Sequence, residues 1–296
     1  MLLFQRIEEF SYQYTDSRRI IGEFMLSHKG ELERLTMQEI ADRTFTSKAS
    51  LVRFAQALGF SGWKELLKEF LAESHYDAAH YTDIDPNFPF SHTSSTRDIV
   101  YQICNLQVES LLDTADLIDF HQLDKAVSYL KTCDKIAVFG QAPNSYVARL
   151  FQRKMLTIGR CVLQPDETNG MLAHSLNASD CAIIISYSGS GENRSPLNLL
   201  PILKARKVPV IGITGQGDNL LRRSSNAVLT ISTRERLYSK IANYATEESI
   251  GYLLNVLFSC CFQEHYHENL AYKIGVSQRI EQRTSIYADM REEETP

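Results

Sequence analysis

The sequence lacks long apolar runs and paired cysteine motifs. Its longest apolar run, residues 250–262, is interrupted by Gly251, Asn255 and Ser259 and is too short to span a bilayer. The first ten residues show no basic start followed by an apolar stretch, so we expect no signal peptide and no membrane partner. None of the six cysteines forms a C-x-x-C pair, which favours reduced core thiols of a cytoplasmic protein over a disulfide framework.

The sequence also lacks a basic surplus. Its net charge is -5, and this alone argues against nucleic-acid binding, because proteins that bind nucleic acids often carry excess positive charge. A whole-chain average can nevertheless hide a basic patch. The remaining composition, with 44% hydrophobic and 23% charged residues, is typical of globular proteins, and 296 residues are enough for two domains.

Sequence motifs for common cofactors are absent. No G-x-x-x-x-G-K-[ST] occurs, and no G-x-G-x-x-G follows an apolar run, which excludes a P-loop and a dinucleotide fingerprint. Glu264, His265, His267 and Glu268 resemble metal ligands, but they follow an apolar helix and have no partner cluster at a suitable spacing. We interpret them as a surface helix end and expect neither a metal nor a cofactor.

The pattern along the chain divides it into four parts. Residues 1–77 have helical periodicity, and residues 78–96 contain prolines and small polar residues typical of a linker. Residues 97–283 alternate β-rich apolar runs with helical stretches, and the acidic residues 284–296 form a tail.

Two short helices around a tight turn are predicted in the first part. Thr36 and Glu39 form a capping box that opens the first helix. Ser47 can cap a second helix over residues 48–58, which Gly59 ends. This arrangement predicts a helix-turn-helix, in which the second helix enters the major groove of DNA.

The second helix has one apolar face and one polar face. Ser50, Arg53 and Gln56 lie opposite the apolar side chains, where small and hydrogen-bonding residues suit contact with base edges. Residues 43–64 contain four basic residues (Arg43, Lys48, Arg53 and Lys64) and no acidic one, a local charge of +4 available for phosphate contacts. A structural helical hairpin with a solvated face is the alternative.

Five apolar runs follow in the third part, at residues 135–140, 160–163, 181–186, 208–214 and 226–231. Helical stretches separate them, including residues 145–158 and 196–207. Consecutive side chains in these runs are apolar, so both faces of each strand would be apolar. This pattern indicates a parallel sheet covered by helices on both faces, an α/β fold.

Polar loops follow three of these runs, where an open α/β sheet binds its ligands. The loop of residues 186–191 combines three serines with two glycines ahead of a helical stretch, a pattern that can cradle an anion. Together the loops suggest a phosphorylated small ligand, and ordinary turn chemistry is the alternative for any one of them. The expected ligand-binding residues are Gly140, Asn144, Ser145, Ser186, Ser188, Gly189, Ser190 and Thr214.

Residues 46–66 and 185–189 resemble the RpiR/MurR family of bacterial transcription regulators, and the resemblance extends over about residues 7–282. Family members join an N-terminal helix-turn-helix to a C-terminal sugar isomerase (SIS) domain. The resemblance implies an all-α helix-turn-helix domain followed by a flavodoxin-like, doubly wound, parallel five-stranded SIS domain. It also implies that Ser47, Ser50 and Arg53 face DNA. The full set expected at DNA is Arg43, Thr46, Ser47, Lys48, Ser50, Arg53, Gln56 and Lys64.

Two loops depart from the family pattern. Ala142 and Asn144 stand where the first loop usually has glycine and serine, and Gly191 stands where the second usually has threonine. Asn144, Ser145 and Ser190 could compensate for the displaced hydroxyls; otherwise the effector binds differently or is not phosphorylated.

The resemblance implies a cytoplasmic transcription regulator that binds operator DNA as a dimer or tetramer and responds to a sugar phosphate. We therefore expect no catalytic residues. The main alternative is a SIS-type phosphosugar isomerase or etherase, for which Glu247, Glu248 and His174 are the candidate general bases. A second alternative is a SIS protein that regulates an enzyme through protein contacts.

Overall fold

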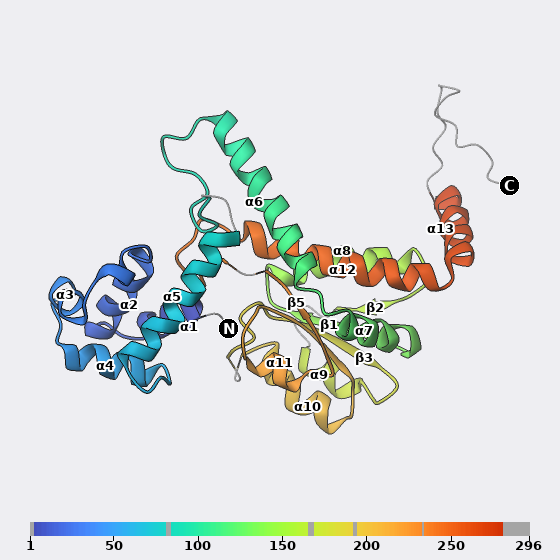
Figure 1. The fold of residues 1–296 in the computed structure, drawn as a ribbon. Helices are drawn as coiled ribbons and strands as arrows, with labels where there is room; N and C mark the ends of the chain where they lie inside the picture. Colours follow the sequence, from blue (N-terminus) through green and yellow to red (C-terminus); the bar gives the residue numbers. More distant parts are fainter. Residues whose placement is uncertain (1–2, 81–83, 165–168, 192–193, 233, 281–296) are drawn as a thin grey trace.

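The structure is a computed structural model that describes residues 3–80, 84–164, 169–191, 194–232 and 234–280. The N-terminal part is entirely helical (Figure 1). Its elements are α1 (Leu3–Tyr12), α2 (Ser17–Ser27), a 3-10 turn (Leu32–Arg34), α3 (Met37–Arg43), α4 (Lys48–Ala57) and α5 (Trp63–His80).

The sequence signals for helix starts in this part are confirmed. The Thr36 hydroxyl accepts the Glu39 N–H at 3.2 Å, and the Glu39 carboxylate accepts the Thr36 N–H at 2.7 Å. Ser47 caps α4 by accepting the Ser50 N–H at 3.1 Å. All five helices contribute to one apolar core, which includes Ile7, Ile21, Ile40, Leu51, Phe54, Trp63, Leu66 and Phe70.

The C-terminal part is built on a parallel sheet. The helices before it are α6 (Thr96–Asp116), which begins at the end of the segment expected as a linker, and α7 (Phe120–Thr132). The strands are β1 (Ile136–Gly140), β2 (Val162–Leu163), β3 (Cys181–Ile185), β4 (Val210–Thr214) and β5 (Ala227–Thr230). Their order β2-β1-β3-β4-β5, with parallel pairing throughout, confirms the predicted doubly wound five-stranded fold.

Helices cover both faces of this sheet, which explains the continuous apolar strands (Figure 1). Ile183 and Ile185 point to one face, which packs against α7, α8 (Asn144–Leu156) and α12 (Tyr244–Glu264). Ile184 points to the other face. The elements that cover it are α9 (Asn169–Ser175), a 3-10 turn (Leu197–Leu199), α10 (Leu200–Ala205) and α11 (Leu220–Ser224).

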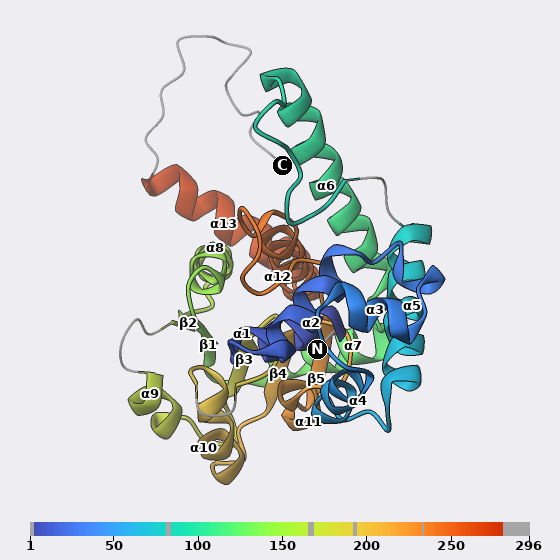
Figure 2. The same ribbon diagram turned by 90° about the vertical axis from the view of Figure 1, so that its left-hand side faces the viewer.

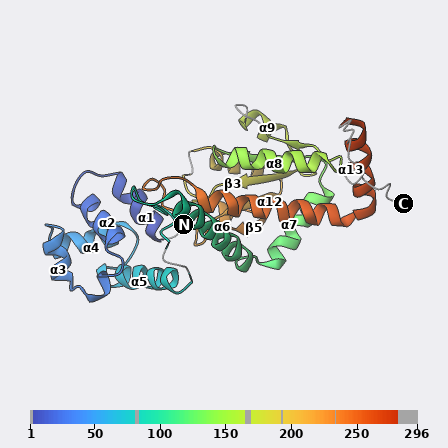
Figure 3. The ribbon, with the colours of Figure 1, turned by 90° about the horizontal axis from the view of Figure 1, so that it is seen from above.

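The apolar stretch 250–262 lies within α12, and Ile250, Leu253 and Leu257 are buried in the core. Seen from above, α8 and α12 run side by side over the sheet, and α13 (Tyr266–Ile280) turns away at the far end (Figure 3). All six cysteines are free thiols, and Cys181 alone is fully buried. Within the described ranges, no helix is long and apolar enough to cross a bilayer.

Candidate functional site

The turn between α3 and α4 is fixed by backbone hydrogen bonds of a Schellman motif. The Thr46 N–H donates to the Ala41 carbonyl at 2.8 Å, and the Phe45 N–H donates to the Asp42 carbonyl at 3.2 Å. The buried Thr44 hydroxyl donates to the Ile40 carbonyl at 2.7 Å. These bonds set the angle at which α4 leaves α3, as a helix-turn-helix requires.

Helix α4 exposes the residues expected at DNA and buries its opposite face. Ser47, Lys48, Arg53 and Gln56 are exposed, whereas Thr46 and Ser50 are half-buried. The Arg53 guanidinium lies 3.4 Å from the Ser50 hydroxyl. Helices α3 and α4 lie at the end of the molecule farthest from the sheet, so a duplex can reach them (Figures 1 and 2).

The remaining basic residues differ in their surroundings. Lys64 is exposed at the start of α5. Arg43 pairs with Glu31, the Nη1 to Oε2 distance being 3.0 Å, although residues 43–64 contain no acidic residue. Glu31 therefore offsets part of the local positive charge.

A cavity of about 440 Å³ opens at the carboxyl ends of β1 and β3. Among the expected ligand-binding residues, four line it: Asn144, Ser186, Ser188 and Ser190. The hydroxyls of Ser186 and Ser188 also accept N–H groups of their own loop, at 3.2 and 3.4 Å, which holds the loop in shape.

The other expected residues lie behind this surface and do not line the cavity: Gly140, Ser145, Gly189 and Thr214. Gly189 has a φ of +61°, and a β-carbon there would lie 2.3 Å from the Asn219 side chain and 2.7 Å from the Thr214 hydroxyl. Thr214 is fully buried and accepts a hydrogen bond from the Asn219 amide at 3.2 Å. Gly189 and Thr214 thus allow the serine loop to fold back over β4.

Several cavity residues were not predicted. Arg194 follows the serine loop and brings a cation to the cavity, which its position after the loop could have indicated. Tyr187 also lines it, and burial raises the pKa of this phenol to about 12, so its hydroxyl is neutral at physiological pH. Glu9, Leu237 and Tyr238 complete the wall from remote parts of the chain, and no local pattern marks them.

The part of the cavity wall formed by Leu237 and Tyr238 also contacts helix α1. The Glu8 side chain is buried, and its carboxylate accepts the N–H groups of Leu237, Tyr238 and Ser239 at 2.5, 3.3 and 2.9 Å. Gln5 donates its side-chain amide to the Glu235 carbonyl at 3.0 Å. The segment of residues 234–243 therefore touches the cavity on one side and the helix-turn-helix domain on the other.

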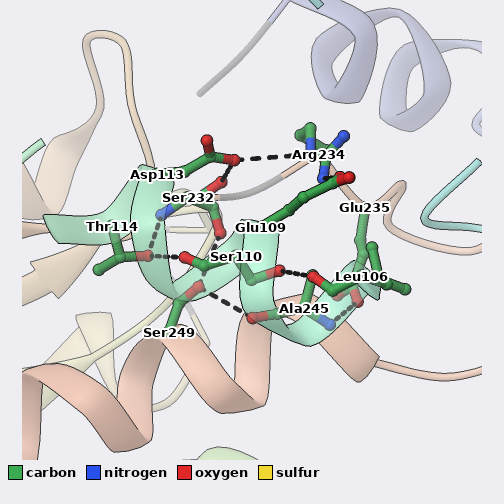
Figure 4. Close-up of polar contacts among 10 residues, drawn as sticks. All are labelled: Leu106, Glu109, Ser110, Asp113, Thr114, Ser232, Arg234, Glu235, Ala245 and Ser249. Atoms are coloured by element: carbon green, nitrogen blue, oxygen red, sulfur yellow. Dashed lines mark hydrogen bonds and ion pairs between the residues drawn. The ribbon is translucent and has the colours of Figure 1, made fainter. Parts of the chain in front are cut away.

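Buried polar contacts anchor this segment to α6 and α12 (Figure 4). The Arg234 guanidinium lies 2.9 Å from the Glu109 carboxylate, and their side chains are only 6% and 15% exposed. The Glu235 carboxylate accepts the Ala245 N–H at 2.6 Å and the Thr246 hydroxyl at 2.5 Å. Burial raises the pKa of Glu235 despite these bonds.

The candidate general bases lie away from the cavity lining. Glu248 accepts a hydrogen bond from the Gln107 amide at 3.0 Å, and burial raises the pKa of Glu247. His174 is exposed on α9.

The four metal-like residues lie around the junction of α12 and α13 and are exposed, and Glu264 pairs with Lys131. In the part of the chain that the structure describes, no three His, Cys, Asp or Glu side chains are grouped to hold a metal ion.

Comparison with known families agrees with this geometry. Residues 1–76 match the helix-turn-helix domain of the rpiR family, and residues 129–256 match the SIS domain. The chain thus joins a helix-turn-helix domain of the rpiR family to a SIS domain. The predicted resemblance is confirmed over both domains.

Two relatives match most of the length of the chain. The chain is 26% identical over 239 residues to an uncharacterized HTH-type transcriptional regulator of Thermotoga maritima, covering 79% of this chain and 83% of the relative. It is 24% identical over 271 residues to the uncharacterized HTH-type transcriptional regulator YbbH of Bacillus subtilis, covering 90% and 92%. The fold is similar to that of the Vibrio vulnificus NanR protein complexed with ManNAc-6P. In that comparison the TM-score is 0.59 and the identity 20%, over 96% of this chain and 100% of NanR.

Proposed function

We propose that this RpiR-family protein is a bacterial transcription regulator acting in the cytoplasm. Its helix-turn-helix domain binds operator DNA, and a phosphorylated sugar in the SIS cavity changes the affinity for that DNA. The observation that carries the proposal is the shared wall of the cavity: Glu9 belongs to α1, and Tyr238 belongs to the segment that holds α1. A ligand that moves this wall acts directly on the DNA-binding domain.

The chemistry of the cavity supports a phosphorylated ligand. Ser186, Ser188 and Ser190 supply hydroxyls, Arg194 supplies a positive charge, and the N-terminus of α8 begins at Asn144. The dipole of this helix favours a negative charge at that end. The volume lies within the range of about 300–1,000 Å³ that small-molecule sites occupy, and NanR was solved with ManNAc-6P. Ser145 lines no part of the cavity, so we propose that Asn144 and Ser190 replace the hydroxyls missing from the family pattern.

We propose that the protein binds this ligand without converting it. An isomerase needs a general base beside the reacting carbons. Among the described lining residues the one carboxylate is Glu9, which stands on the DNA-binding domain rather than on the SIS domain. Incubation with sugar phosphates, followed by NMR of the products, tests this: we expect no isomer to form. Turnover that Glu9→Gln abolishes would instead establish the isomerase.

We propose that a second copy packs against α6. Tyr101, Val108 and Leu112 are 57%, 49% and 62% exposed and lie on one side of this helix at helical spacing. A dimer would present two recognition helices to a palindromic operator. Leu112→Asp should therefore lower the oligomeric mass measured by light scattering, whereas a dimer of unchanged stability would place the interface elsewhere.

The DNA-binding part of the proposal is tested by selecting duplexes from a random library with the full-length protein. Arg53→Ala should weaken binding to the selected duplex by about 1–3 kcal/mol. It should leave the thermal unfolding midpoint nearly unchanged, because Arg53 is exposed. Arg19→Ala is the matched control, since Arg19 is a half-exposed arginine on α2 paired with Glu23. Failure to enrich any duplex, or equal losses for the two variants, would contradict the proposed role of α4.

A further inference from the structure

Phe45 stands out in the turn between α3 and α4 for two reasons. Its side chain is 95% exposed, and its backbone has a φ of +52°, in the left-handed region. For a bulky residue this backbone conformation is strained, because the β-carbon crowds the neighbouring carbonyl oxygen.

The Schellman motif explains why the left-handed conformation is needed but not why phenylalanine occupies it. The residue whose N–H donates to the Asp42 carbonyl must be left-handed, and glycine adopts that conformation without strain. Because the ring is exposed, its packing within the folded chain does not offset the backbone strain. Glycine at this position would therefore relieve the backbone strain and remove the exposed apolar ring. Strained residues of this kind cluster where a protein binds its partners.

The position of Phe45 points to the partner. It lies two residues before Ser47, the N-cap of α4, and between the exposed Arg43 and Lys48. When a recognition helix enters the major groove, residues at its N-terminal end reach the base edges. The apolar feature of that groove is the methyl group of thymine, against which phenylalanine packs.

We infer that Phe45 contacts DNA directly, packing its ring against a thymine methyl group in the major groove and contributing to the choice of sequence. This inference rests on the proposed function. A second copy of the chain covering Phe45 is the other possible occupant, and the experiment separates the two.

The test uses the duplex selected with full-length wild-type protein and three variants. Phe45→Gly and Phe45→Ala both remove the ring, but only glycine relieves the backbone strain. Both variants should bind the duplex about tenfold more weakly. Phe45→Gly should unfold at the same temperature as the wild type or a higher one. Phe88→Ser is the matched control, because Phe88 is a half-exposed phenylalanine outside the helix-turn-helix, and it should keep wild-type affinity.

The contact to thymine is tested by replacing each thymine of the duplex with uracil, which lacks the methyl group. At one position per half-site the wild type should lose affinity, while Phe45→Gly should lose none.

Four results would overturn the inference. The first is unchanged affinity of Phe45→Gly, and the second is wild-type affinity of Phe45→Ala alongside a weak glycine variant. The third is an equal effect of uracil on wild type and Phe45→Gly at every position. The fourth is a change of oligomeric mass in Phe45→Gly that accounts for its weaker binding. Failure to select any duplex overturns the proposed function, and the inference with it, whereas these four results leave the proposed function standing.

Discussion

Glu8 is the residue whose replacement should uncouple the two domains. Its buried carboxylate accepts three backbone N–H groups from the segment that also lines the SIS cavity. Helix α1, which carries Glu8, belongs to the same apolar core as the recognition helix α4. We therefore expect a displacement of this segment to move the whole DNA-binding domain.

The size of the effect follows from the three hydrogen bonds. A hydrogen bond to a charged group contributes about 1.5–3 kcal/mol. Glu8→Gln keeps the shape of the side chain, but it removes the charge and turns an amide NH₂ toward one of the three donors. We expect the contact between α1 and the segment to lose about 2–4 kcal/mol. Coupling between two sites is typically worth about 1–3 kcal/mol, so the variant should lose most of it.

The assay is fluorescence anisotropy of the selected duplex, with and without a sugar phosphate identified by thermal shift. The ligand should change the DNA affinity of the wild type by at least about fivefold and that of Glu8→Gln by less than about twofold. Glu69→Gln is the matched control, because Glu69 is an exposed glutamate on α5 of the same domain, and it should keep wild-type coupling. A folded Glu8→Gln protein that still binds ligand and retains the full change in DNA affinity would refute this route of coupling.

Three further predictions concern the loops and anchors of the structure. Gly189→Ala should lower the unfolding midpoint and abolish stabilisation by ligand, because the new β-carbon would meet the Asn219 side chain at 2.3 Å; an undiminished thermal shift with ligand would contradict this. Glu109→Gln should cost about 1.5–3 kcal/mol in urea unfolding, since it removes the nearer of the two carboxylates paired with the buried Arg234 and leaves Asp113 at 3.9 Å; a loss below about 1 kcal/mol would show that the Glu109 pair is dispensable. The capping-box bonds, first from the N-cap N–H and then from its hydroxyl, lower the pKa of Glu39 below its ordinary 4.5. The stability they add is thus present above about pH 4.5 and lost as the pH falls through the lowered pKa. The difference in urea midpoint between wild type and Glu39→Gln should shrink from about pH 6 to about pH 3, and a difference that grows on acidification would reverse the sign.

Local signals in the sequence were sufficient for most of the fold. The capping box at Thr36 and the cap at Ser47 depend only on neighbouring residues, so the helix-turn-helix could be placed correctly. The five apolar runs can likewise be recognised from neighbouring residues alone, and they correctly predicted the five strands. The expected helix at 196–207 is instead a 3-10 turn followed by α10, because Pro201 has no backbone N–H and suits the first turn of a helix rather than its interior.

The cavity could be predicted only in part. Polar residues that follow parallel strands collect at one edge of the sheet, which placed the serine loop at the cavity. Thr214 also ends a strand, yet it is buried under Gly189, because the serine loop folds over β4. Glu9 and Tyr238 reach the cavity through the packing of α1 on the segment of residues 234–243, and tertiary contacts of this kind leave no local pattern.

The charge of the DNA-binding end could also be predicted only in part from the sequence. The net charge of -5 is an average over the chain and does not reveal the basic stretch that ends in the exposed Lys64. The charge of that stretch in turn does not reveal that Arg43 pairs with Glu31, which lies outside it. Because the positive charge at the DNA-binding end is modest, one domain can neutralise few phosphates, so we expect a modest DNA affinity that falls as salt rises and that depends on dimerisation to reach useful strength.

The most direct test of the account is a linkage measurement on the full-length wild-type protein. The affinity for the selected duplex is measured with and without the sugar phosphate, and the affinity for the sugar phosphate is measured with and without the duplex. If the SIS cavity controls the DNA-binding domain, both affinities change by the same factor, at least about fivefold. Two affinities that are each unaffected by the other ligand would contradict the central claim that this protein is a sugar-phosphate-responsive regulator.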